Sequence, residues 1–400
     1  MNNRTMTIAL KSGKPTLGQS IPYGKQYIDE KDIQAVNDVL ISPYLTTGPK
    51  VKEFEEKLCK LTKAKYAIVL SSGTAALHAA CYAVGITDGD EVITTPITFA
   101  ASANCVLYCG GIPIFADIDP ETWNINPMEV EKKITNKTKA VIAVDFTGQA
   151  VQLDELKEIC KKHNLLLIED AAHSIGTKYK GKFVGGIADL TTFSFHPVKT
   201  ITSGEGGAVM TNRESLFKKI ELFRTHGIIR NPELMTQNPF NGYNEQIELG
   251  YNYRMTDIQA ALGVSQLDKL SDFSKRRSNI VQMYNEAFSK IPQLKIQKEI
   301  PESETTRHLY IIRLKLELLT VGRYEILKAI VAENVGVQIH YPPVYYHPYY
   351  QSLGYKKGLC PIGEQLYDEI ITIPLYFSLT DEDVENVIEA VIKVVNYYRK

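Results

Sequence analysis

Lys199 is the residue whose surroundings most suggest chemistry. It is the one lysine in residues 192–207, TFSFHPVKTITSGEGG, a stretch that runs from an apolar, strand-like segment into a glycine-rich turn. A primary amine in such a place can hold an aldehyde cofactor covalently. Most lysines are solvated surface cations, however, so Lys199 taken alone would be interpreted as an ordinary loop residue.

Asp170 and His173 change that interpretation. Asp170 lies in the apolar run LLLIEDAAHS, residues 165–174, and His173 follows it three positions later. An acid at the carboxyl end of a buried parallel strand lies where open α/β sheets bind their ligands. A lysine and a carboxylate are the groups that pyridoxal 5'-phosphate requires, the first for its aldehyde and the second for its pyridine nitrogen. The pair therefore predicts this cofactor.

A third feature is the turn that joins the strand-like YAIVL to an alanine-rich helix. It contains Ser71, Ser72, Gly73 and Thr74. Free backbone amides and the positive end of the helix dipole make such a helix start a phosphate site. Ordinary capping by Ser or Thr produces the same pattern without any ligand. The order of phosphate turn, acid and lysine along the chain is what favours a cofactor site.

The elements that must position these groups alternate between strands and helices. Strands are predicted at residues 66–70, 91–96, 112–119, 140–148 and 165–174, with two more near 190–195 and 207–211. This rhythm is typical of a mostly parallel sheet. From Thr256 onward, apolar residues at helical spacing predict long helices that lead to a small α+β domain. We therefore expect an N-terminal extension over residues 1–20, a large domain over 21–270 and a small C-terminal domain over 271–400.

Composition agrees with a cytoplasmic enzyme. The chain has 400 residues, 44% of them hydrophobic, and a formal net charge of −1, so no nucleic-acid-binding or polybasic membrane surface is expected. The six cysteines lack paired C-x-x-C spacing, which suits reduced core thiols. No stretch approaches a signal peptide or a transmembrane helix. His340 and His347 have no third ligand at metal spacing, so no metal site is predicted.

The sequence resembles the DegT/DnrJ/EryC1/StrS family of sugar-nucleotide aminotransferases, which belong to the fold-type I class of pyridoxal-phosphate enzymes. The likeness runs from about Pro22 to near the C-terminus. It rests on SSGTAALHAA, TPITFAAS, IEDAAHSIG, FSFHPVKTITSGEGGAV, GYNYRMTDIQAALG and GVQIHYPPV, in the family's order. The resemblance implies an α/β fold whose large domain holds a mostly parallel seven-stranded sheet.

Within the family, three segments look most like the pseudaminic-acid branch: SFH-x-x-K-x-I-T, DFTGQ at residues 145–149, and VQIHYPPV. That branch aminates C4 of a UDP-linked 2-acetamido-2,6-dideoxy-4-ketohexose and gives UDP-4-amino-4,6-dideoxy-N-acetyl-β-L-altrosamine. The family also implies L-glutamate as the amino donor, although no residue here identifies the donor.

The resemblance implies a role for each matching catalytic and cofactor-binding residue. Lys199 would hold pyridoxal 5'-phosphate and carry a proton between the donor's Cα and C4' of the cofactor, with pyridoxamine 5'-phosphate as the intermediate form. Asp170 would pair with the pyridine nitrogen, and His173 would lie near the ring; a hydrogen-bonded core histidine is the alternative interpretation of His173. The other implied cofactor contacts are Gly73, Thr74 and Ser194 to the phosphate, Phe99 stacked on the ring, and Asn252 from the neighbouring subunit of a homodimer.

The substrate contacts implied by the pseudaminic-acid branch come from four separate segments and from two cofactor-binding residues. They are Tyr23, Ile41, Ser42, Pro43, Tyr44, Ser71, Gln338, Ile339, His340 and Tyr341, together with Ser194 and Asn252. Aromatic and polar side chains on loops suit a sugar and a uracil ring, through stacking and hydrogen bonds.

Three alternatives remain open at this stage. The first is amination of another nucleotide 4-ketosugar, such as the precursor of bacillosamine or legionaminic acid, or the GDP sugar of perosamine synthesis. The second is a pyridoxal-phosphate-binding regulator without turnover. The third is the family's deoxygenating dehydratase, which has histidine at the lysine position. Lys199 and Asp170 are both present, which argues against the second, and Lys199 argues directly against the third.

Overall fold

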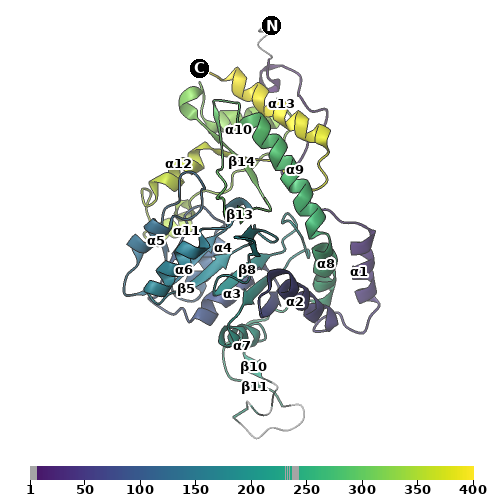
Figure 1. The fold of residues 1–400 in the computed structure, drawn as a ribbon, viewed down its shortest axis with the longest axis vertical. Helices are drawn as coiled ribbons and strands as arrows, with labels where there is room; N and C mark the ends of the chain where they lie inside the picture. The colour runs from purple at the N-terminus through teal and green to yellow at the C-terminus, as the bar shows by residue number, and fades with distance from the viewer. Residues whose placement is uncertain (1–6, 230, 232, 234, 237–242) are drawn as a thin grey trace.

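A seven-stranded sheet forms the centre of the large part of the molecule, in the order β1-β9-β8-β5-β4-β2-β3 (Figure 1). The computed structural model describes residues 7–229, 231, 233, 235–236 and 243–400. The strands are β1 (Tyr66–Leu70), β2 (Glu91–Thr94), β3 (Ile112–Phe115), β4 (Thr138–Val144), β5 (Leu166–Asp170), β8 (Leu190–Ser194) and β9 (Gly207–Thr211). Only β9 pairs antiparallel with its neighbours β1 and β8; the other pairs are parallel. The predicted mostly parallel α/β sheet is therefore confirmed.

Helices cover both faces of this sheet. One face packs against α3 (Gly73–Val84), α4 (Ala101–Tyr108) and α7 (Glu214–Phe223), and the other against α2 (Pro49–Thr62), α5 (Pro127–Lys133), α6 (Leu153–Lys162) and α8 (Asp257–Asp268). Successive residues of a strand point to opposite faces, so Ile168 packs on the face covered by α3, α4 and α7, and Leu167 packs on the opposite face. Burial on both faces explains why the strands read as continuous apolar runs.

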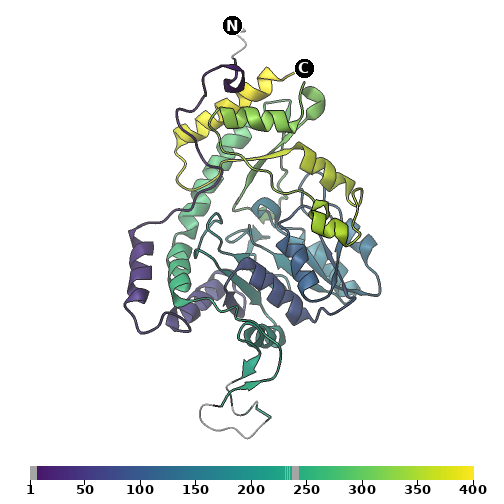
Figure 2. The same ribbon diagram turned by 180° about the vertical axis from the view of Figure 1, so that it is seen from behind.

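The C-terminal part forms a second core at the other end of the long helix α9 (Leu270–Phe288) (Figures 1 and 2). A three-stranded antiparallel sheet, β12 (Leu294–Ile296), β14 (Tyr310–Leu314) and β15 (Ile370–Ile373), packs against α9, α10 (Arg323–Ala332) and α13 (Asp381–Tyr397). Two shorter helices, α11 (Pro348–Ser352) and α12 (Pro361–Glu369), lie between α10 and β15 in the chain.

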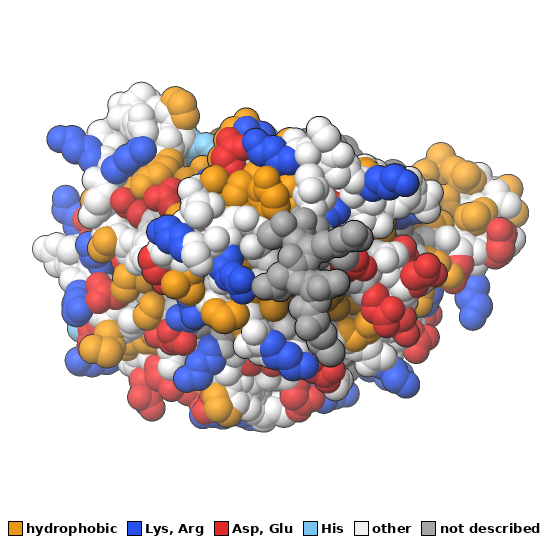
Figure 3. Space-filling model, turned by 90° about the horizontal axis from the view of Figure 1, so that it is seen from above, with side chains coloured by type: hydrophobic (Ala, Val, Ile, Leu, Met, Phe, Trp, Pro, Cys, Tyr) orange, Lys and Arg blue, Asp and Glu red, His pale blue; other side chains and the backbone are white. Residues whose placement is uncertain are grey.

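The N-terminal segment packs on this C-terminal core. Ile8 and Leu17 are buried in it, and the Leu17 N–H donates to the Glu333 carbonyl oxygen over 3.3 Å. Figure 2 shows the first described residues and the C-terminus at the same end of the molecule. On that end, basic and acidic side chains are interspersed (Figure 3). Residues that the sequence marks as an extension therefore contribute to a hydrophobic core.

Several smaller elements complete the described fold. Helix α1 (Glu30–Leu40) packs against α8. Strands β10 (Ile228–Ile229) and β11 (Glu245–Gln246) pair in a projection beyond α7 (Figure 1). Strand β13 (Ser303–Glu304) pairs with β6 (Lys178–Tyr179), which pairs with β7 (Lys182–Phe183). This small sheet joins the segment after β5 to the segment before β14, close to the candidate site.

Candidate active site

One cavity of about 580 Å³ brings together most of the predicted site residues. It lies at the carboxyl ends of β4 and β5, and segments of the C-terminal part, including His308 and His340, close it. Predicted residues that line the cavity are Tyr23, Gly73, Thr74, Phe99, Asp170, His173, Ser194, Lys199, His340 and Tyr341. Strand ends of an open parallel sheet are where ligands bind in such folds.

Lys199 reaches the cavity from the loop that connects β8 to β9. The Phe195 N–H donates to the Gly206 carbonyl over 2.8 Å, and the Ser203 N–H donates to the Phe195 carbonyl over 3.0 Å, which closes the loop on itself. Burial lowers the pKa of Lys199 to about 8, although the nearby Asp170 carboxylate acts in the opposite direction. A larger fraction of this amine is therefore neutral at physiological pH than of a surface lysine, and the neutral amine is the nucleophilic form.

Asp170 ends β5 and is almost fully buried. Ser102 donates its hydroxyl to Oδ2 of Asp170 over 2.7 Å, and the Ala172 N–H donates to Oδ1 over 3.2 Å. Burial raises the pKa of Asp170, while these two donors and the charge of Lys199 partly oppose the rise. A cation placed against this carboxylate would strengthen the charged form, as the charged pyridine nitrogen of a bound cofactor would.

The start of α3 supplies the anion-binding end of the cavity. Ser72 caps the helix by accepting the Ala75 N–H over 3.0 Å, and the first-turn amides of Gly73 and Thr74 have no intrahelical acceptor. A Cβ at Gly73 would lie 2.8 Å from Cβ of Ser194, so glycine lets the helix start approach β8. Hydroxyls of Thr74 and Ser194 lie at the same end of the cavity.

His173 and His340 are neutral imidazoles in this site. Burial, with a further contribution from the charge of Lys199, holds the pKa of His173 well below its usual value, and the same two causes lower the pKa of His340 to about 4. His340 Nδ1 lies 2.9 Å from the Thr372 hydroxyl. His173 Nε2 lies 3.4 Å from the Tyr341 hydroxyl.

The remaining predicted residues do not line the cavity. Ser71 precedes its rim and donates its N–H to the Tyr253 carbonyl over 2.9 Å. Ile41, Ser42, Pro43 and Tyr44 form an exposed turn after α1, with Ile41 82% exposed. Asn252 and Gln338 are also exposed, and Ile339 is half-buried. Phe99 borders the cavity but is 61% exposed, so one of its faces is uncovered in a single chain.

Polar residues that line the cavity but were not predicted include Ser102, Thr192, His196, Glu205 and His308. Ser102 is the last residue of the TPITFAAS motif, so its hydroxyl could have been considered from the sequence. His308 comes from a distant part of the chain, and only the folded structure brings it to the cavity of Asp170 and Lys199.

The residues present fit pyridoxal 5'-phosphate. An amine with a depressed pKa, a buried carboxylate, a helix start with two hydroxyls and an exposed aromatic ring line one cavity, which matches the aldehyde, ring nitrogen, phosphate and ring face of that cofactor. Among the described residues, no group of three or more His, Cys, Asp or Glu side chains is arranged to hold a metal ion. In the same part of the chain, no helix is long and apolar enough to cross a membrane.

Comparison with known proteins agrees with this geometry. The sequence pattern of the DegT/DnrJ/EryC1/StrS aminotransferase family matches residues 26–392. The spore coat polysaccharide biosynthesis protein SpsC of Bacillus subtilis is 40% identical over 377 residues, which are 94% of this chain and 97% of SpsC. A UDP-4-amino-4,6-dideoxy-N-acetyl-β-L-altrosamine transaminase of Campylobacter jejuni is 38% identical over 95% of this chain and 99% of its own.

Solved structures give the same result. PseC of Helicobacter pylori, an aminotransferase of pseudaminic acid biosynthesis, superimposes with a TM-score of 0.89 and 34% identity, covering 95% of this chain and all of PseC. Spr1654 of Streptococcus pneumoniae, assigned as a sugar aminotransferase and solved in its pyridoxal-phosphate form, gives a TM-score of 0.88 with 30% identity, covering 94% of this chain and 99% of its own.

Proposed function

Because this chain belongs to the DegT/DnrJ/EryC1/StrS aminotransferase family and is a pyridoxal-phosphate-dependent sugar aminotransferase, we propose a specific reaction for it. It transfers the amino group of L-glutamate to C4 of a UDP-linked 4-keto-6-deoxy-N-acetylhexosamine and gives UDP-4-amino-4,6-dideoxy-N-acetyl-β-L-altrosamine. The observation that carries the proposal is the convergence of Lys199, Asp170 and the start of α3 on one cavity. The activities for which the Campylobacter and Helicobacter relatives are named support the choice of sugar.

Each site residue has a proposed task. Pyridoxal 5'-phosphate supplies the aldehyde that receives the amino group and the ring that withdraws electrons from the donor carbon. Lys199 holds the cofactor and then carries the proton at its Nζ, for which a pKa near 8 suits it. Asp170 keeps a proton on the ring nitrogen. The amides of Gly73 and Thr74, with the hydroxyls of Thr74 and Ser194, hold the phosphate.

The sugar nucleotide lies, in this proposal, against the aromatic end of the cavity. The rings of Tyr23 and His340 are 5.5 Å apart, and those of His340 and Tyr341 are 4.7 Å apart. Such an aromatic surface can stack on a sugar or a uracil ring, and the polar atoms of these three side chains can bind hydroxyl and carbonyl groups. Neutral His340 does not repel or attract the diphosphate strongly, so it serves here as a hydrogen-bonding group.

We also propose that two copies of the chain share their sites. Asn252 does not line the cavity of its own chain, and Phe99 beside the cavity is 61% exposed. A second copy that brings its Asn252 to the phosphate end would complete the site, so an isolated monomer would be less active. We propose the cytoplasm as the site of this reaction.

The test of this proposal is product identification. Purified enzyme, L-glutamate and a panel of UDP- and GDP-linked 4-ketosugars are incubated, and the 4-amino products are identified by mass spectrometry and NMR. The proposal expects amination of the L-arabino ketosugar with the stereochemistry of the altrosamine product. Exclusive amination of the D-xylo ketosugar would instead indicate a bacillosamine or legionaminic acid role, and exclusive amination of a GDP sugar a perosamine role.

A further inference from the structure

The imidazole rings of His308 and His173 pack against each other beside the cofactor cavity. Their ring centroids are 4.6 Å apart with the planes tilted by 49°, and both residues line the cavity. Both are nearly fully buried, and Nδ1 of each has no hydrogen-bond partner among the described residues. A buried imidazole is normally oriented by a hydrogen bond to one ring nitrogen, so another cause must fix these rings.

The orientation of the His173 ring is fixed mainly by packing. Its one polar contact is the 3.4 Å approach of Nε2 to the Tyr341 hydroxyl, which is at the long limit of a hydrogen bond. On its other side the ring lies against His308. Loss of the His308 ring would therefore leave the orientation of His173 to Tyr341, through this weak polar contact and a ring contact with centroids 6.2 Å apart.

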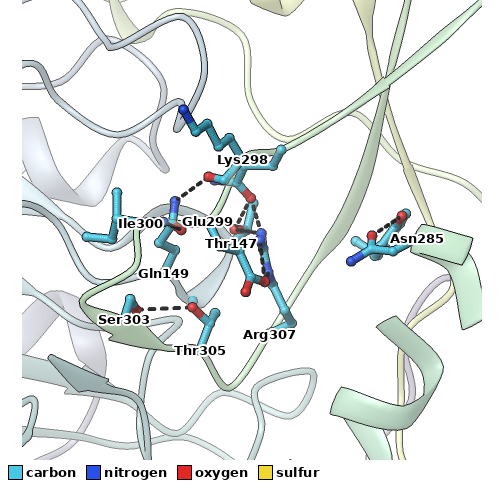
Figure 4. A network of polar contacts seen from close by, with 12 residues as sticks. Thr147, Gln149, Asn285, Lys298, Glu299, Ile300, Ser303, Thr305 and Arg307 are labelled. Atoms are coloured by element: carbon cyan, nitrogen blue, oxygen red, sulfur yellow. Dashed lines mark hydrogen bonds and ion pairs between the residues drawn. The ribbon is translucent and has the colours of Figure 1, made fainter. Parts of the chain in front are cut away.

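The backbone of His308 is held from both sides. Its N–H donates to the Thr147 carbonyl over 2.8 Å, and its carbonyl accepts from Nη1 of the buried Arg277 over 3.2 Å. The neighbouring Arg307 donates from Nη1 to the Thr147 hydroxyl over 2.8 Å and pairs through Nη2 with Glu299 over 2.8 Å. Figure 4 shows the part of this network formed by Thr147, Glu299 and Arg307.

Gly148 is the point where the two histidine segments meet the turn. Its φ is +105°, and a Cβ there would lie 2.8 Å from the His173 carbonyl oxygen and 3.0 Å from the His308 nitrogen. The turn belongs to the DFTGQ motif, to which the proposed reaction assigns no task. Its glycine allows both segments to approach the same backbone atom at once.

We propose that His308 is a positioning residue of the aminotransferase reaction: it holds the ring of His173 at the cofactor, and the DFTGQ turn holds His308. The inference rests on the proposed function and on the position near the cofactor ring that the family resemblance gives His173, and it is independent of which sugar is aminated. Nδ1 of His308 has no hydrogen-bond partner among the described residues, so a flat apolar ring can replace its packing. The variant His308→Phe keeps a ring but removes both nitrogens, and it therefore distinguishes positioning from direct proton transfer.

The test compares four holoenzyme variants, His308→Ala, His308→Phe, His173→Ala and the double alanine variant, with His163→Ala as a surface control. Single-turnover bleaching of the cofactor's visible absorbance is followed at saturating L-glutamate, and the visible circular dichroism of the bound cofactor is recorded without donor. We expect His308→Ala to slow the saturating rate roughly 10- to 100-fold and to change the dichroism, because small misplacements of reacting groups are costly. His308→Phe should recover most of the saturating rate and most of the dichroism signal. If His308→Ala does not fold, His308→Leu takes its place.

In the His173→Ala background, His308→Ala should have no further effect beyond about twofold, because the two residues act as one unit. Equal losses in His308→Ala and His308→Phe, independent losses in the double variant, or an unchanged rate in either single alanine variant would each overturn the inference. If glutamate fails to bleach even the unmodified enzyme, the proposed donor is wrong. The dichroism comparison then still decides the inference: a signal that is changed by alanine and restored by phenylalanine supports it, and an unchanged signal rejects it.

Discussion

Ser102 donates a 2.7 Å hydrogen bond to Oδ2 of Asp170, and the Thr98 hydroxyl lies 2.8 Å from the Ser102 hydroxyl. All three residues are buried, so this relay fixes the carboxylate that faces the cofactor's ring nitrogen in the proposed site. Asp170 therefore depends on α4 as well as on its own strand.

Replacement of Ser102 by alanine should weaken cofactor binding. A hydrogen bond to a charged group contributes about 1.5–3 kcal/mol, which corresponds to roughly a 10- to 100-fold loss of affinity. The measurement is the Kd of pyridoxamine 5'-phosphate for the apoprotein by calorimetry, because this form binds without a covalent bond to Lys199. Ser352→Ala, at an exposed hydroxyl on α11, is the matched control and should leave the Kd unchanged. Equal Kd values for Ser102→Ala and the unmodified protein would contradict the role of the relay.

The reactivity of Lys199 should depend on pH with a midpoint near 8. Its neutral amine is the reacting form, and burial lowers its pKa to about 8 from 10.5, so capture of pyridoxal 5'-phosphate by the apoprotein should accelerate as the pH rises through 8. The rate is measured from the growth of visible absorbance at a series of pH values. Asp170 raises the pKa of Lys199, so Asp170→Asn should move the midpoint to lower pH. A midpoint above 10 would show that Lys199 is solvated in the apoprotein.

Glu169 should destabilise the fold at alkaline pH. It is fully buried on the opposite face of β5 from Asp170, accepts a 2.8 Å hydrogen bond from Thr191, and burial raises its pKa to about 7 from 4.5. The folded state thus binds a proton that the unfolded state has released, and this stabilisation is present below pH 4.5 and lost as the pH rises through 7. Glu169→Gln should raise the free energy of unfolding at pH 8 by about 1–3 kcal/mol.

The measurement for Glu169 is urea unfolding at pH 6 and pH 8. The variant should show a smaller fall in stability between the two pH values than the unmodified protein. Glu158→Gln, on the exposed face of α6, serves as the control and should leave the pH dependence unchanged. If Glu169→Gln instead lowered the free energy of unfolding at pH 8, the prediction would be contradicted, because the charged Glu169 carboxylate would then stabilise the folded state.

Glu333 should anchor the N-terminal segment. Its buried carboxylate accepts the Ala9 N–H over 2.8 Å and the Thr16 N–H over 2.8 Å, and it pairs with Lys393 over 2.8 Å. Burial alone would raise its pKa, but these donors hold the pKa of Glu333 below its usual value. Removal of one member of a buried ion pair costs about 3–5 kcal/mol, so Glu333→Gln should lower stability by an amount of that order.

Limited proteolysis and thermal unfolding check the prediction for Glu333. The variant should be cleaved faster between residues 9 and 16 and should unfold at a lower temperature. Glu325→Gln removes a surface partner of Lys328 on the same helix and should change neither result by a comparable amount. Unchanged cleavage of Glu333→Gln would show that apolar packing of Ile8 and Leu17 holds the segment without the carboxylate.

The sequence was sufficient for the sheet and for the residues next to its strands. Continuous apolar runs identify strands buried on both faces, so Asp170 and Lys199 could be placed at the ends of β5 and β8. The start of α3 was predictable because its serine cap and glycine follow a strand directly. These patterns consist of residues that are contiguous in sequence, so they can be recognised without the folded structure.

The rest depends on segments that are distant in sequence. His308 reaches the site because the turn at Thr147 and Gly148 binds the segment before β14, a contact that no local pattern encodes. Gln338 was grouped with His340 in one substrate-binding segment, yet its backbone pairs with Thr372 and its side chain is exposed, while His340 lines the cavity. The two residues are two positions apart, so strand alternation does not separate them, and their proximity in sequence does not predict that only His340 lines the cavity of a single chain.

Identification of the lysine that holds the cofactor tests the central claim most directly. The holoenzyme is reduced with sodium borohydride, which fixes the cofactor to its lysine, and the labelled peptide is sequenced by mass spectrometry. The account predicts a single label on Lys199, and a Lys199→Ala variant that transfers no amino group. A label on another lysine, or full transamination by Lys199→Ala, would contradict it.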